Sequence, residues 1–203
     1  MRVTLFTATF SIIIAAVLLV GELRLREDRA VMRMYTEMSE ATEKALDDTC
    51  EYLGIVPEDG NGIGQNGAAY LESIFEEALA ASLGIDVAAR RDMIKRMTDI
   101  FAVFDGKGSL IVRSKRNGDD RLRFENIKSN DEAAALLSGL IGQEIFLPDN
   151  TDMIGNKAAD GRSLLVCLKC HSGSLLSNNK DIVIIRNAQV KKKTRQRELP
   201  GLL

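Results

Sequence analysis

Residues 3–20, VTLFTATFSIIIAAVLLV, form the one long uncharged run of this chain. As a helix, these 18 residues extend roughly 27 Å, which is close to the hydrocarbon thickness of a bilayer. Arg2 precedes the run, and Glu22 and Arg24 follow it. We therefore expect a single-pass transmembrane anchor over residues 1–22, with the lipid bilayer as its partner and the cell membrane as its location.

A cleaved signal peptide and a buried soluble helix are the alternatives to an anchor. The positive region before the run is only two residues long, and no small-residue cleavage site follows it, so we favour an uncleaved signal anchor. Sidedness is ambiguous. The arginines that follow the run favour a cytoplasmic bulk by the positive-inside rule, whereas short anchors with a small basic head commonly export the rest. We expect the bulk of the chain to be extracytoplasmic.

The helical pattern continues beyond the run, which predicts an amphipathic helix over residues 23–54. Apolar or small residues recur three or four positions apart on one side of an acidic helix: Val31, Met34, Met38, Ala41, Ala45, Thr49 and Tyr52. Gly54 and Pro57 are typical of a helix end. The apolar stripe would pack either on the domain that follows or on a partner helix.

A Gly-rich loop over residues 55–67 precedes an expected α+β domain over residues 68–190. Its clearest element is a hairpin, in which two apolar strands flank the turn Asp105–Gly108. Elsewhere the pattern predicts helices over 68–83, after Asp86 and from Asn130 or Asp131, and strands over 121–124, 163–169 and 181–186. Antiparallel strands and leading helices predict an α+β fold with helices packed on a small antiparallel sheet.

Charge and composition exclude some functions. The net charge is −2, so the chain has no overall electrostatic footprint for specific nucleic-acid binding. The exception is a basic tail over residues 191–203, which includes KKKTRQR at 191–197. Such a tail is either a solvated end or a contact for an anionic surface.

The sharpest chemical motif is Cys167-Leu-Lys-Cys170-His171. The pattern C-x-x-C-H is the attachment signature of c-type haem. Together with Cys50, the same side chains are also zinc-ligand types, and the two cysteines could form a redox pair. The apolar residues 164–166 lead into the motif as a strand, whereas haem attachment needs a helix beside an apolar pocket. We expect small structural residues here, no cofactor and no metal, with haem as the alternative.

No active site is evident from the sequence. His171 is the only histidine, and nothing places a nucleophile beside it. The adjacent carboxylates Glu76 and Glu77 would point apart on a helix, so we expect them on a solvated face. These observations favour a non-enzymatic protein.

Two resemblances add to these expectations. The hairpin FAVFDGKGSLIV at residues 101–112 resembles extracytoplasmic Cache/PAS-type modules. The overall layout, with DIVIIRNAQV at residues 181–190, is similar to uncharacterised single-pass proteins of clostridial-type bacteria, some of which occur with Tad-type pilus or secretion components. The second resemblance implies a minor pilin-like or assembly role, with the N-terminal helix packed laterally against other subunits.

The leading hypothesis is therefore a membrane-anchored, non-enzymatic structural or assembly component of a cell-envelope complex, whose partners contact the N-terminal helix. One alternative is an extracytoplasmic ligand-binding sensor module. The other is an anchored c-type cytochrome that uses the C-x-x-C-H motif.

Overall fold

The computed structural model describes residues 2–53, 55, 63–85, 87–118, 120–142, 162–172 and 180–189. At some of these positions, among them 2–9 and 171–172, the description covers the backbone alone. Most of the Gly-rich loop, the irregular stretch before residue 162 and the basic tail over 191–203 lie outside the described residues.

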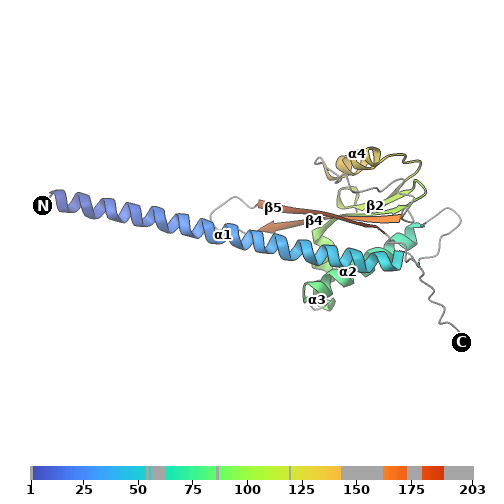
Figure 1. Cartoon of the computed structure of the whole chain (residues 1–203), viewed down its shortest axis with the longest axis horizontal. Coiled ribbons are helices and arrows are strands. Elements are labelled where there is room, and N and C mark those ends of the chain that lie inside the picture. The colour runs from blue at the N-terminus through green and yellow to red at the C-terminus, as the bar shows by residue number, and fades with distance from the viewer. Residues whose placement is uncertain are drawn as a thin grey trace, which may run out of the picture.

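A five-stranded antiparallel sheet forms the centre of an α+β domain, in the order β3-β2-β1-β4-β5. Helices α1 and α2 pack on one face and α4 on the other (Figure 1). The elements are α1 Arg2–Leu53, α2 Gln65–Ser82, α3 Val87–Met97, β1 Thr98–Asp105, β2 Leu110–Ser114, the 3₁₀ turn Lys115–Asn117, β3 Arg121–Phe124, α4 Asn130–Ile141, β4 Arg162–Ser172 and β5 Lys180–Gln189.

The long helix α1 has two halves with different surroundings. From Met38 onward, side chains three and four residues apart are buried against the domain, ending with Leu53, which is fully buried. Thr42 and Thr49 donate their hydroxyls to the carbonyls of Met38 and Ala45, both at 2.6 Å, so these buried polar groups are satisfied inside the helix. The N-terminal half extends away from the domain (Figure 1).

The prediction of a transmembrane anchor over residues 1–22 is contradicted. Across the described residues, no helix carries an apolar stretch long enough to cross a bilayer. The predicted transmembrane helix, signal anchor and single-pass topology are therefore corrected.

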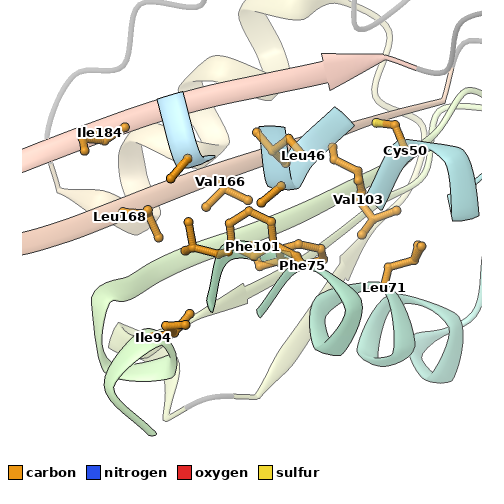
Figure 2. Packing of buried hydrophobic residues seen from close by; sticks show 14 of the residues in the cluster. Leu46, Cys50, Leu71, Phe75, Ile94, Phe101, Val103, Val166, Leu168 and Ile184 are labelled. Atoms are coloured by element: carbon orange, nitrogen blue, oxygen red, sulfur yellow. The ribbon is translucent and has the colours of Figure 1, made fainter. Parts of the chain in front are cut away.

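The larger core lies between the sheet and the two helices on its first face. Leu46 of α1 and Phe75 of α2 meet Phe101 of β1 and Val166 of β4 in this cluster (Figure 2). The rings of Phe75 and Phe101 are tilted, with centroids 5.8 Å apart, a spacing typical of favourable aromatic pairs. This cluster fixes the domain to the C-terminal half of α1.

The second core lies on the opposite face and follows from strand alternation. Successive residues of a strand point to opposite faces, so Ile100, Ala102 and Phe104 of β1 face α4. Ser129 caps α4, because its side-chain hydroxyl accepts a hydrogen bond from the backbone amide of Glu132 at 3.2 Å. The cap is thus one or two residues earlier than the predicted Asn130 or Asp131, because a serine hydroxyl can reach the amide three residues on.

The predicted hairpin is present, and its turn is held by one carboxylate. Oδ1 of the buried Asp105 accepts hydrogen bonds from the backbone amides of Lys107 at 2.8 Å and Ser109 at 2.9 Å. Gly108 has a φ of +93°, and a Cβ there would lie 3.3 Å from the carbonyl oxygen of Ile127. Both the backbone conformation and the close approach therefore require glycine at this position.

Truncation of Leu46 tests whether α1 is part of the domain core. We expect Leu46→Ala to lower the free energy of unfolding by about 3 kcal/mol, because it leaves a cavity between α1 and the sheet. Leu25→Ala makes the same truncation where the side chain is 58% exposed, so it should change the value by less than about 0.5 kcal/mol. Urea unfolding of the dilute chain measures both, and equal effects would contradict the docking of α1.

Candidate functional site

Most of the exposed large apolar side chains among the described residues lie on one part of α1, residues 10–25, which we call the apolar segment. Its exposed large side chains are Phe10, Ile12, Ile13, Ile14, Val17, Leu18, Leu19, Val20, Leu23 and Leu25. Val17 and Leu18 are 66% and 68% exposed, although both are strongly apolar. Soluble monomers rarely expose contiguous apolar patches of this kind, and such patches commonly mark interaction sites.

The segment is apolar around its whole circumference. Residues 12–20 contain no polar side chain, so the segment has no solvated face to set against an apolar stripe. A helix that is apolar on all sides is normally surrounded by other apolar groups. Within the described residues, the domain begins to cover α1 only at Val31, Met34 and Tyr35. Intramolecular packing therefore accounts for the C-terminal half of α1 and not for the apolar segment.

Charged residues begin at the C-terminal part of this segment. Arg26 donates to Glu22 at 2.6 Å, one helical turn away, and both side chains are more than 60% exposed. Ion pairs with this exposure contribute little to stability. This ion pair therefore contributes little to the stability of α1 itself.

The two cysteines of the C-x-x-C-H motif do not come together. Both lie on β4, and their spacing of three residues places them on opposite faces of the sheet. Cys170 belongs to the core beneath α1, and Cys167 to the core beneath α4. The side chain of His171 lies outside the described residues. Attachment of one haem needs both thiols on the same side, so this geometry gives the haem hypothesis no support.

Burial also makes both thiols poor nucleophiles and poor ligands. Burial, followed by the nearby Asp99 carboxylate, raises the pKa of Cys167 from 9.0 to about 12, with Lys169 opposing them. Burial raises the pKa of Cys170 as well, with Lys115 acting in the opposite direction. The thiolate is the form that attacks and binds metals, and Cys167 carries almost none of it near pH 7.

The zinc alternative meets the same difficulty. Cys50 lies in α1 and is buried in the core shared with Cys170, whereas Cys167 is on the other face of the sheet. Within the described ranges, no three His, Cys, Asp or Glu side chains gather as a metal site. None of Cys50, Cys167 and Cys170 forms a disulfide bond.

A buried ionic cluster between α2 and the β2–β3 edge was not predicted from the sequence. Glu72 of α2, which is 4% exposed, pairs with Arg113 of β2, which is 2% exposed. The second carboxylate oxygen of Glu72 accepts a hydrogen bond from the guanidinium of Arg121 at 2.6 Å. The cluster links α2 to two strands, and its members Glu72 and Arg113 are buried, so we assign it a structural role.

The sequence offered one weak signal for this cluster. Glu72 and Glu76 are four residues apart on the face of α2 that carries Phe75 and Leu79, and both are buried. The expected solvation of Glu76 is therefore wrong, whereas Glu77 is exposed. An acidic residue at a core position of an amphipathic helix indicates a buried basic partner, but the sequence does not say which one.

Comparison with protein-family models, with curated proteins and with solved structures finds no match to this chain.

Replacement of Glu72 tests the ionic cluster. We expect Glu72→Gln to lower the free energy of unfolding by about 3 kcal/mol, because it removes the negative charge that faces two arginines in a buried site. The neighbouring Glu77→Gln makes the same change at an exposed position and should cost less than about 0.5 kcal/mol. Denaturant unfolding at pH 7 compares them, and a loss below about 1 kcal/mol in Glu72→Gln would contradict a cluster that fixes α2.

The raised pKa of Cys167 predicts a loss of stability at alkaline pH. Above pH 9 the unfolded chain releases this proton while the folded chain retains it up to about pH 12. The folded state then binds more protons, so the free energy of unfolding falls as the pH rises. The contribution of Cys167 to the free energy of unfolding is fully present below pH 9. Between pH 9 and pH 12 it falls by about 1.4 kcal/mol per pH unit.

Cys167→Ala isolates this contribution from other alkaline titrations. The variant is less stable at pH 7 because it leaves a small cavity, but its stability should decline less steeply between pH 9 and 11. Unfolding curves at four pH values give the two slopes. Equal slopes would show that Cys167 ionises as freely in the folded chain as in the unfolded one.

Proposed function

We propose that this chain is a non-enzymatic structural subunit of a larger assembly, in which the apolar segment of α1 packs against apolar helices of other subunits. The exposure of the apolar segment carries this proposal. Ten large apolar side chains between residues 10 and 25 are exposed. Their burial in an assembly would contribute on the order of 10 kcal/mol, even if each were only partly covered.

The division of α1 into two halves supports a display role. The C-terminal half is part of the domain core, and the N-terminal half carries the contact surface, within one unbroken helix. Val17 and Met38 are separated by about 32 Å along the axis of α1, at the usual helical rise. A bundle of apolar segments would therefore form an assembly core with the α+β domains arranged outside it.

We propose a pilus-like or secretion-like complex of the cell envelope as the assembly. This part of the proposal follows the sequence resemblance to proteins found with Tad-type pilus or secretion components, and an extracytoplasmic location belongs to it. The sensor hypothesis stays a prediction, because no described feature identifies a ligand.

A single carboxylate in the apolar segment tests the proposal. Val17→Glu should release the subunit from its assembly, because a charge in an apolar helix bundle costs several kcal/mol when unpaired. Met93→Glu adds the same group at an exposed apolar position of α3, away from α1. This control should leave the assembly intact.

The measurement is the sedimentation of the full chain in extracts of cells that produce it. The parent chain and Met93→Glu should sediment as a high-mass species, and Val17→Glu near the 22.3 kDa of a single chain. A parent chain that sediments as a single chain, or a Val17→Glu variant that stays in the large species, would contradict the proposal.

A further inference from the structure

The outward side of α1 carries one line of charged residues in which the signs are segregated. Three arginines, Arg26, Arg29 and Arg33, come first, spaced three and four residues apart, and all are exposed. The same line continues through residues 37, 40, 44, 47 and 51, which are acidic except Lys44, and Glu43 and Asp48 flank it. The buried positions Ala41, Ala45 and Thr49 lie between them and face the domain. The line therefore lies on the side of α1 away from the domain.

This order of charges makes the line complementary to a displaced copy of itself. A displacement of about four helical turns, roughly 21 Å along the axis, aligns the basic stretch with an acidic one. It places Arg26, Arg29 and Arg33 beside the second copy's Glu40, Glu43 and Asp47. A displacement shorter by one turn would place Arg33 beside Lys44, and no displacement at all would place like charges side by side.

An apolar feature on the flank of the line fits the same displacement. Leu18, Leu25 and Met32 are 68%, 58% and 64% exposed and recur at a heptad spacing, so they share one side of α1. Because the displacement equals two heptads, Leu18 of one copy would lie beside Met32 of the next. Met32 lies beyond the apolar segment, and this contact gives its exposure an explanation.

We infer that the partner at this surface is a second copy of this chain, parallel to the first and displaced along α1 by two heptads, so that Arg26 meets Glu40. The inference rests on the proposed function and names one neighbour in the assembly. In this register the apolar segment of one copy lies beside residues 24–39 of the next, so other subunits cover most of that segment. An antiparallel pair would also match Arg26 with Asp47 and Arg33 with Glu40, but it would place Leu18 opposite a position beyond Leu53, where α1 ends, and would leave Met32 without its apolar contact.

The contact is heterologous, because the basic stretch of one copy meets the acidic stretch of the next. In a pair of copies, one therefore keeps an unused acidic stretch and the other an unused basic stretch, and these can bind further copies. Exposed ion pairs add little affinity, so the contact of Leu18 with Met32 supplies the apolar part of the association while the charges select the register.

Charge reversal of the purified full chain tests the inference. The first variant carries Arg26→Glu, Arg29→Glu and Arg33→Glu, and the second carries Glu40→Arg, Glu43→Arg and Asp47→Arg. Each variant alone places like charges at every contact, so association in low salt should weaken by about ten-fold or more. An equal mixture restores opposite charges at the contacts between the two variants and should associate as the parent chain does.

The control reverses Lys95 and Arg96 to glutamate on α3, away from α1, and should associate normally. Sedimentation velocity measures association, and circular dichroism checks that every variant keeps the fold. Register is measured by cross-linking a mixture of Leu18→Cys and Met32→Cys chains, which is reliable because the three native cysteines are buried. The mixture should cross-link well and each variant alone poorly, whereas an antiparallel pair would cross-link neither.

The outcomes separate this inference from the proposed function. A purified parent chain that stays monomeric, charge-reversed variants whose mixture does not recover, or a mixture of Leu18→Cys and Met32→Cys chains that does not cross-link would overturn the displaced copy as partner. If Val17→Glu still releases the chain from its assembly in cells, the proposed function stands with a different partner. If Val17→Glu also has no effect, both are wrong.

Discussion

The structure depends on one unbroken helix that buries only its C-terminal half. From Met38 to Leu53, α1 contributes small and apolar side chains to the core beneath the sheet, and this contact holds the helix at a fixed place in the domain. The same continuity carries residues 10–25 away from the domain (Figure 1). The exposed apolar surface is therefore a consequence of helix length, because no described part of the chain folds back to cover it.

Local sequence signals predicted much of the domain. The hairpin was identifiable because Asp105–Gly108 supplies both a side-chain acceptor and positive-φ residues between two apolar strands. The end of α1 near residue 53 followed from Gly54 and Pro57. Strand order could not be predicted, because the pairing of β1 with β4 joins segments that are far apart in the chain, and local periodicity contains no information on such pairing.

For the candidate site, the sequence located the residues but did not predict how they are arranged. The sequence identified the apolar run and the Cys167–His171 motif but assigned both from pattern alone. The strand conformation of β4 separates Cys167 from Cys170, since residues three apart on a strand face opposite sides. The Glu72 cluster escaped notice because its partners, Arg113 and Arg121, lie on strands distant in the chain and meet Glu72 only after the sheet has formed.

The central claim is that protein surrounds the apolar segment of α1 in the functional state. The most direct measurement is the reaction rate of a water-soluble maleimide with a cysteine placed at Leu18, compared with one at the exposed Met93 of α3, in the native assembly. The account predicts that the cysteine at position 18 reacts many-fold more slowly in the assembly than in the dilute, dissociated chain, while position 93 changes little. Equal, fast reaction at both positions in the native assembly would contradict it.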